Sequence, residues 1–268
     1  MKEHILQVIK QIELKYEVKI LFACESGSRA WGLHSKDSDY DVRFIYVHKP
    51  SWYLSIDEKR DVIEIPKQDN LSFSVDPLLD MNGWELIKAL RLFRKSNPSL
   101  FEWLNSSIIY YQSYSTIEKM NAMSRKIFSP VVCINHYFNM AKGNFRDIVK
   151  GTDKSVKKYF NVLRPILAAI WIKKYQSAPP VEFHKLLDEI VEPGDLKEAI
   201  LRLVDQKRGI DLLSAEPNLE IINHFLSSEI EHMETYLTEL KSNLPDPTPE
   251  LNQLYRETLK EVWDLDIL

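Results

Sequence analysis

The sequence predicts an α+β fold, with a small mixed sheet and its helices over residues 1–112 and a helical domain over residues 113–268. The apolar run 18–24, with its β-branched residues, is typical of a buried strand, and residues 39–47 predict a second strand. From about residue 114 the apolar residues recur at helical spacing instead, with breaks at proline and glycine. This change of period predicts the boundary between the two parts.

The composition is typical of a soluble globular protein, with 44% hydrophobic and 28% charged residues in a chain of 268. The formal net charge of −4 excludes a globally basic nucleic-acid binder, so any surface for nucleic acid must be local. The N-terminus is too charged for a signal peptide, and no apolar run approaches the roughly 20 residues that span a membrane. These features predict a cytoplasmic protein.

The first part is predicted to alternate helices and strands. Residues 3–16 place apolar side chains at helical spacing, which is typical of an amphipathic helix that packs on a sheet. The strand over 18–24 leads into a polar turn and a short helical turn before the second strand. Asn82, with Glu85 three residues later, fits a capping box and predicts that a helix begins there.

Two carboxylates stand at the start of the second strand. Asp39 and Asp41 are two residues apart, so on a strand their side chains project from the same face. Close carboxylates repel each other, and a divalent cation such as Mg²⁺ or Mn²⁺ relieves the repulsion by taking oxygen ligands from them and from substrate phosphates. The pattern predicts a metal site; the alternative is that these aspartates only form a turn.

The polar turn between the two strands contains Gly27 and Ser28. Glycine lets a phosphate approach the backbone, and the N–H groups of a helix start, with the Ser28 hydroxyl, can hold phosphate oxygens. A helix N-cap is the alternative role for Ser28. Arg29 follows directly, where its guanidinium can reach a phosphate or a nearby carboxylate.

Gly27-Ser28, then ten residues, then Asp39-x-Asp41 resembles the signature of the DNA polymerase β superfamily of nucleotidyltransferases. The form GSRAWG…DSDYDVR, with GWELIKALRLFRKSNP further on, is similar to the branch of predicted nucleotidyltransferases named RNA-ligase-associated. The resemblance implies a polymerase-β-like mixed sheet followed by a helical domain. It also implies that Asp39 and Asp41 bind metal and act in catalysis, while Gly27, Ser28 and Arg29 bind the nucleotide.

The superfamily usually has a third acid on a neighbouring strand, and the resemblance implies one here. Asp61 and Glu64 lie in a charged region that is typical of a surface, which leaves Asp76 and Asp80 as the candidates. Pro77 follows Asp76 and cannot donate to a sheet ladder, so that position is an edge or a bend. Asp80 comes just before the predicted helix, and we favour it as the third catalytic, metal-binding carboxylate.

A basic segment runs from residue 142 to residue 174, with nine lysines and arginines against two aspartates. A helix face that carries these basic side chains could hold a triphosphate or follow a nucleic-acid backbone. The resemblance implies that a helical domain supplies basic residues to the nucleotide, and the candidates are Lys154, Lys157 and Lys158. The alternative is a solvated helix face that pairs with acidic helices nearby.

These residues together predict a metal-dependent nucleotidyltransferase. It would move a nucleoside monophosphate from a nucleoside triphosphate to an acceptor hydroxyl, with RNA as a possible acceptor, and release pyrophosphate. A non-catalytic module that senses nucleotides or binds nucleic acid is the rival from another class. A second rival is an interaction partner, such as the neutralising half of a two-protein system. An intact Gly-Ser turn with paired carboxylates favours the enzyme.

Overall fold

The computed structural model describes the whole chain except residues 68, 70, 72, 211–216, 241–245 and 266–268. It divides into two compact units. The first contains Met1–Ala30, Ser38–Ile127 and Pro245–Leu268, and the second contains Trp31–Asp37 and Phe128–Leu244. The predicted α+β class is confirmed, because the first unit holds a sheet with helices and the second is helical throughout its described elements.

The sheet of the first unit has five strands in the order β3-β4-β2-β1-β5. The bounds are β1 Val18–Glu25, β2 Tyr40–His48, β3 Val62–Ile65, β4 Leu79–Glu85 and β5 Ile109–Gln112. Strands β2 and β4 pair in parallel and the other neighbours pair antiparallel, so the sheet is mixed, as predicted. The parallel pair brings together two segments that lie almost forty residues apart in the chain.

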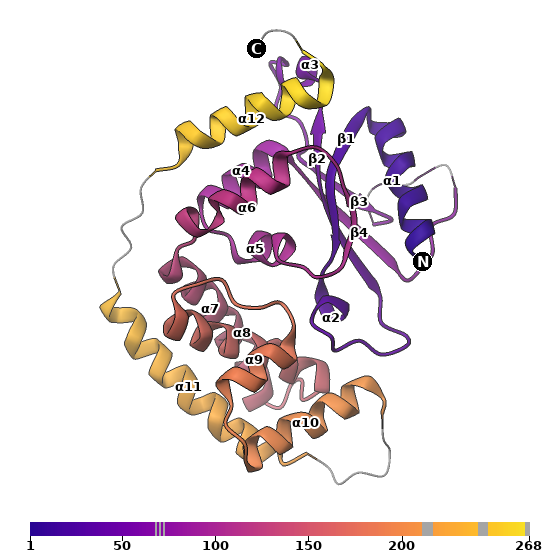
Figure 1. Cartoon of the computed structure of the whole chain (residues 1–268). Helices are drawn as coiled ribbons and strands as arrows, with labels where there is room; N and C mark the ends of the chain where they lie inside the picture. The colour runs from indigo at the N-terminus through magenta and orange to yellow at the C-terminus, as the bar shows by residue number, and fades with distance from the viewer. Residues whose placement is uncertain (68, 70, 72, 211–216, 241–245, 266–268) are drawn as a thin grey trace. The chain divides into compact units, whose positions relative to one another are not determined.

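One face of the sheet is covered by α1, Lys2–Tyr16 (Figure 1). Its apolar stripe, Ile5, Val8, Ile9 and Ile12, is buried and joins the core formed with Val42, Phe44 and Met81 of β2 and β4. Because side chains alternate along a strand, the residues between these core positions project from the opposite face. Asp41, Arg43, Asp80 and Asn82 therefore share that opposite face.

The opposite face also carries α4, Leu86–Arg94, and α5, Pro98–Leu104 (Figure 1). Trp103 of α5 packs on Trp84 of β4 with 3.8 Å between ring centroids, and Phe93 contacts Phe101. The short helices α2, Gly27–Ala30, and α3, Pro50–Tyr53, follow β1 and β2. α4 packs on β2 and β4, whereas α2 lies against the polar first residues of β2, where Gly27 meets Asp41.

The predicted helix start at Asn82 is wrong. Asn82 and Glu85 belong to β4, in which Leu79, Met81, Gly83 and Glu85 are buried in strict alternation. The helix begins at Leu86, and Glu85 is its N-cap, with its carboxylate accepting the Ile87 N–H at 2.6 Å. The capping-box spacing also occurs in a strand, and burial on the core face decided between the two structures here.

The division of the chain differs from the predicted boundary at residue 112. Helices α6, Thr116–Ile127, and α12, Thr248–Trp263, both belong to the first unit. They are joined by a buried hydrogen bond between the Thr116 and Thr258 hydroxyls, at 2.9 Å, and by the ion pairs Lys119–Glu257 and Lys126–Glu250. A helix at the end of the chain thus returns to the sheet unit, which helical periodicity cannot show.

The second unit contains α7 Pro130–Val149, α8 Val156–Tyr175, α9 Phe183–Ile190, α10 Asp195–Arg208 and α11 Leu219–Glu239. It also includes residues 31–37, which leave the first unit directly after α2. The buried Arg164 guanidinium lies 4.6 Å from the centroid of the Trp31 ring, and Arg208 donates to the Gly32 carbonyl. No helix among the described residues is long and apolar enough to cross a membrane.

Glu85 is a buried acid, 1% exposed, at the carboxyl end of β4. Burial raises the pKa of its carboxyl to about 7, although hydrogen bonds from Tyr53 and the α4 backbone oppose the shift. Between its ordinary pKa and pH 7 the unfolded chain loses this proton while the folded chain keeps it. This group therefore lowers the free energy of unfolding as pH rises through that window, and adds no further change above it.

We expect Glu85→Gln to remove this dependence, a difference of about 3 kcal/mol between pH 4.5 and pH 8. Urea unfolding of both proteins at several pH values measures it, and Glu58→Gln, at an exposed acid, is the control. Parallel pH profiles for the wild type and Glu85→Gln would show that the burial of this carboxylate costs nothing.

Candidate active site

The carboxylates Asp41 and Asp80 lie side by side on the face opposite α1. They are direct partners in the parallel pairing of β2 with β4. Asp39 precedes β2 by one residue and is exposed. Asp76 instead lies in the turn before β4, where its carboxylate accepts the Leu78 N–H at 2.9 Å. The structure thus brings Asp80, not Asp76, next to Asp41, while the roles of these residues stay predictions.

Arg43 joins the two carboxylates. Its Nη2 donates to Asp41 Oδ1 at 3.0 Å and to Asp80 Oδ2 at 3.3 Å, and its Nη1 donates to the carbonyls of Val42 and Asp80. Lys67 adds a second cation, 3.2 Å from Asp80 Oδ2. The two cations offset the repulsion between the paired acids. The sequence prediction missed Arg43, although it stands two residues after Asp41 and so on the same strand face.

Gly27 lies directly against Asp41. Its φ is +59°, a left-handed conformation that L side chains rarely adopt, and a Cβ atom at this position would overlap Asp41 Oδ2. The neighbouring Ser26 N–H donates to the Asp41 carbonyl at 2.8 Å. The turn with Gly27 and Ser28 is therefore packed against the start of β2. The two halves of the sequence signature meet in space.

Arg29 holds the segment that leads into β2. Its Nε donates to the Asp39 carbonyl at 3.0 Å and its Nη2 to the Ser38 carbonyl at 2.7 Å. The guanidinium also lies 3.6 Å from the centroid of the Tyr40 ring, within the range of a cation–π contact. Arg29 contacts neither of the two paired carboxylates through these bonds, and its predicted reach to a phosphate stays a prediction.

Glu25 is, after Arg43, a second residue of this region that the sequence prediction missed. It ends β1 and is fully buried, and Oε1 accepts the Asp41 N–H at 2.8 Å while Oε2 accepts the Tyr110 hydroxyl at 2.5 Å. Burial raises the pKa of Glu25 and of Tyr110 above their ordinary values. The available signal was an acid at the end of an apolar strand, directly before the Gly-Ser turn.

The donor set fits a hard divalent cation in its chemistry. Carboxylate oxygens are the ligands that Mg²⁺ and Mn²⁺ prefer, and Asp41 and Asp80 present theirs from adjacent strands. Among the residues that the structure describes, no group of three or more His, Cys, Asp or Glu side chains is already spaced to hold an ion. Arg43 occupies one oxygen of each paired carboxylate, so a cation would have to share or replace its contacts.

A model of the RNA repair pathway DNA polymerase beta family matches residues 1–257. The chain belongs to this family. The resemblance to the polymerase β superfamily that the Gly-Ser and Asp-x-Asp motifs indicated is therefore confirmed. A relative within the same size range, the Uncharacterized protein YcgL of Bacillus subtilis (strain 168), is 47% identical over 263 residues and covers 98% of both chains.

Two solved structures resemble this member of the family at low identity. A nucleotidyltransferase-like protein from Exiguobacterium sibiricum 255-15 is 13% identical, with a TM-score of 0.36 over 95% of this chain and 79% of that one. Spectinomycin adenyltransferase AAD(9) from Enterococcus faecialis, solved with ATP and spectinomycin, is 12% identical, with a TM-score of 0.46 over 85% of this chain and 98% of that one.

The basic segment of this family member lies on α7 and α8 of the second unit. Lys142 pairs with Glu234 at 2.5 Å, and Lys158 pairs with Asp147 at 2.6 Å. These two pairs agree with the alternative of a helix face neutralised by nearby acids. Lys154 and Lys157 are exposed. Neither lysine forms an ion pair with another residue that the structure describes. Their contact with a nucleotide stays a prediction.

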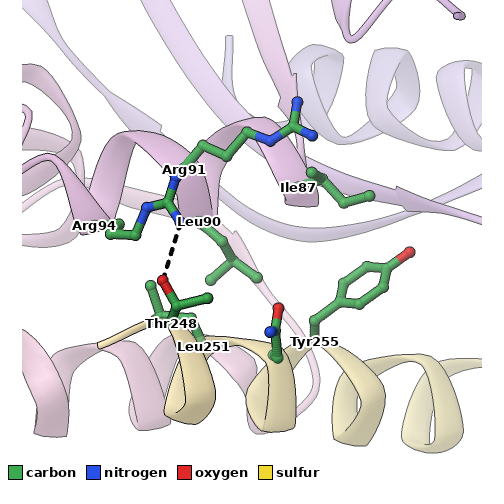
Figure 2. A pocket seen from close by; sticks show the side chains of 8 residues that line it. Ile87, Leu90, Arg91, Arg94, Thr248, Leu251 and Tyr255 are labelled. Carbon is green, nitrogen blue, oxygen red and sulfur yellow. Dashed lines mark hydrogen bonds between the residues drawn. The ribbon is translucent and has the colours of Figure 1, made fainter. Parts of the chain in front are cut away.

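A groove of about 230 Å³ lies between α4 and α12, away from the predicted site (Figure 2). Leu90 and Leu251 contribute apolar surface, and Arg94 reaches across to the Thr248 hydroxyl at 2.9 Å. None of the predicted site residues lines this groove. It lies at the carboxyl end of β4, whereas Asp80 is the second residue of that strand.

Proposed function

We propose that the protein is a metal-dependent nucleotidyltransferase that moves a nucleoside monophosphate from a nucleoside triphosphate to an acceptor hydroxyl and releases pyrophosphate. One observation carries the proposal. The Gly27 turn, Asp41 and Asp80 are held together at the end of the sheet where β2 and β4 begin, so the Gly-Ser turn lies beside the paired carboxylates. Membership of the RNA repair pathway DNA polymerase beta family supports the same chemistry.

In this proposal the turn residues Gly27 and Ser28 hold the triphosphate, with Arg29 beside them. Asp39, Asp41 and Asp80 would hold Mg²⁺ or Mn²⁺. Such an ion supplies positive charge that lowers the pKa of the acceptor hydroxyl and offsets the charge on the leaving pyrophosphate. The acceptor oxygen forms a bond to the α-phosphorus, and the bond from that phosphorus to the pyrophosphate oxygen breaks. The chain's own residues orient the two reactants, and the reaction needs no nucleophile from the protein.

We propose RNA as the acceptor class and the cytoplasm as the place of action. The description of the family as part of an RNA repair pathway supports an RNA hydroxyl over other acceptors. An RNA strand also suits the exposed lysines of the basic segment, since each phosphate that a lysine neutralises releases a counterion. Label found on protein or on a small molecule instead of RNA would show that the acceptor hydroxyl belongs to that class.

Purified protein, incubated in turn with each of the four labelled nucleoside triphosphates, tests the proposal. Total RNA, total protein and no acceptor are compared, and pyrophosphate and labelled product are measured with Mg²⁺, with Mn²⁺ and with a chelator. We expect label in RNA and pyrophosphate release that both need the divalent ion. Nucleotide binding without pyrophosphate release under every condition would favour the non-catalytic module instead.

The exposed lysines of the second unit make a separate prediction about RNA affinity. The logarithm of affinity falls with the logarithm of salt concentration by about 0.7 for each phosphate of a single strand that is neutralised. Replacing Lys154 and Lys157 together by Ala should therefore flatten this slope by about 1.4. Fluorescence anisotropy with a single-stranded RNA at several salt concentrations measures the slope.

Lys142→Ala is the matched control, because Lys142 is already paired with Glu234. It should change the slope by much less than the double variant. Equal slopes for the wild type and the double variant would mean that this surface does not contact RNA.

A further inference from the structure

The amide of Asp41 lies just beyond the end of a sheet ladder. The antiparallel pairing of β1 with β2 ends at Glu25 opposite Val42, because the chain turns away through Ser26 into α2. A backbone N–H that is partly buried at such a point needs an acceptor from elsewhere. The Glu25 side chain supplies it, with Oε1 2.8 Å from the Asp41 nitrogen.

Glu25 is itself held from the other side, by the segment that leads into β5. Its N–H donates to the Ile108 carbonyl at 2.9 Å, and its carbonyl accepts the Ser106 hydroxyl at 2.8 Å. The Tyr110 hydroxyl occupies Oε2. The carboxylate therefore has a donor on each oxygen and little freedom to move. A chain of hydrogen bonds runs from Tyr110 through Glu25 to the backbone of Asp41.

Burying the Glu25 carboxylate completely costs free energy, because the charged group loses its water, and Asp41 adds a second negative charge nearby. An apolar side chain would fill the same space at lower cost, but it could not accept the Asp41 N–H. The Asp41 carbonyl is already fixed by Ser26, and its carboxylate is packed against Gly27. Glu25 thus completes a set of contacts that hold the Asp41 backbone and side chain in one orientation.

We propose that Glu25 is a positioning residue, whose buried side chain fixes the Asp41 backbone so that the Asp41 carboxylate faces the Gly27 turn and can bind a divalent cation. This inference rests on the proposed function insofar as Asp41 is a cation ligand. It predicts that the hydrogen-bond acceptor at position 25 matters and that its negative charge does not.

Two variants of similar length separate these properties. Glu25→Met fills the space without an acceptor for the amide, and Glu25→Gln keeps a carbonyl acceptor without the charge. Hydrogen exchange of the Asp41 amide, followed by NMR, reports the contact directly, and Mn²⁺ titration reports the site. We expect Glu25→Met to speed this exchange and to weaken Mn²⁺ binding by about tenfold or more, and Glu25→Gln to restore both.

Glu85→Gln is the matched control, because it removes the other buried acid at the opposite end of the sheet and should change neither measurement. A folded Glu25→Met protein with wild-type exchange at Asp41 would overturn the proposal. If the wild type binds no Mn²⁺, the proposed function fails, and the exchange rate alone decides whether Glu25 positions Asp41. Should Glu25→Met not fold, Glu25→Gln decides alone, because it keeps the acceptor: an Asp41 amide that exchanges faster than in the wild type would overturn the proposal.

Discussion

Asp41→Asn should abolish divalent-dependent pyrophosphate release, with a loss of more than about a hundredfold in kcat/KM and little change in stability. The amide keeps the shape of the side chain and can still accept from Arg43 Nη2, but it removes the charge that a cation needs. Loss of an outer partner of a metal ligand already costs 10- to 100-fold in affinity or activity, so loss of a proposed ligand should cost more.

Steady-state kinetics with Mg²⁺ and Mn²⁺, beside a thermal unfolding curve, measure both effects. Asp80→Asn should behave as Asp41→Asn does, because the two carboxylates are register partners on adjacent strands. Asp76→Asn is the matched control, since that carboxylate only caps a turn. Wild-type activity in Asp41→Asn would contradict the proposed site. Activity lost in Asp76→Asn but kept in Asp80→Asn would make Asp76 the third carboxylate.

Gly27→Ala should reduce activity by about a hundredfold or more and also destabilise the protein by about 1–3 kcal/mol. The left-handed φ of +59° strains any L side chain, and the new methyl group would overlap the Asp41 carboxylate. Because the carboxylate must move to make room, the loss of activity should exceed what the loss of stability explains. Kinetics at a temperature where the variant is fully folded measure the difference.

Two other glycines provide matched controls. Gly83→Ala introduces a Cβ that overlaps the Phe44 ring on the core face, so it should lower stability without moving the carboxylates. Gly143→Ala meets nothing within 4 Å in α7 and should stabilise that helix by about 0.5–1 kcal/mol. If Gly27→Ala lost no more activity than Gly83→Ala at equal stability, the turn would have no special role in the site.

The sequence by itself determined the local features of this protein. Local patterns over 18–24 and 39–47 predicted β1 and β2, and the helical spacing predicted α1, because these patterns arise within a few residues of each other. The Gly27-Ser28 turn and Asp39-x-Asp41 were recognised in the same way, and the family match across residues 1–257 confirms the resemblance they indicated. The capping-box pattern at Asn82 failed because a local spacing cannot report which face of a segment will be buried.

Only the tertiary structure decided which distant residues meet. Asp80 lies beside Asp41 because β2 and β4 pair in parallel, and that register follows from burial of alternate residues against α1. The roles of Glu25 and Arg43 depend on where β1 ends and on which strand stands next to β2. Likewise, α12 joins the sheet unit through side chains such as Thr258, more than a hundred residues from their partners. Pairings of this kind are selected by packing over the whole unit, so no short stretch of sequence contains them.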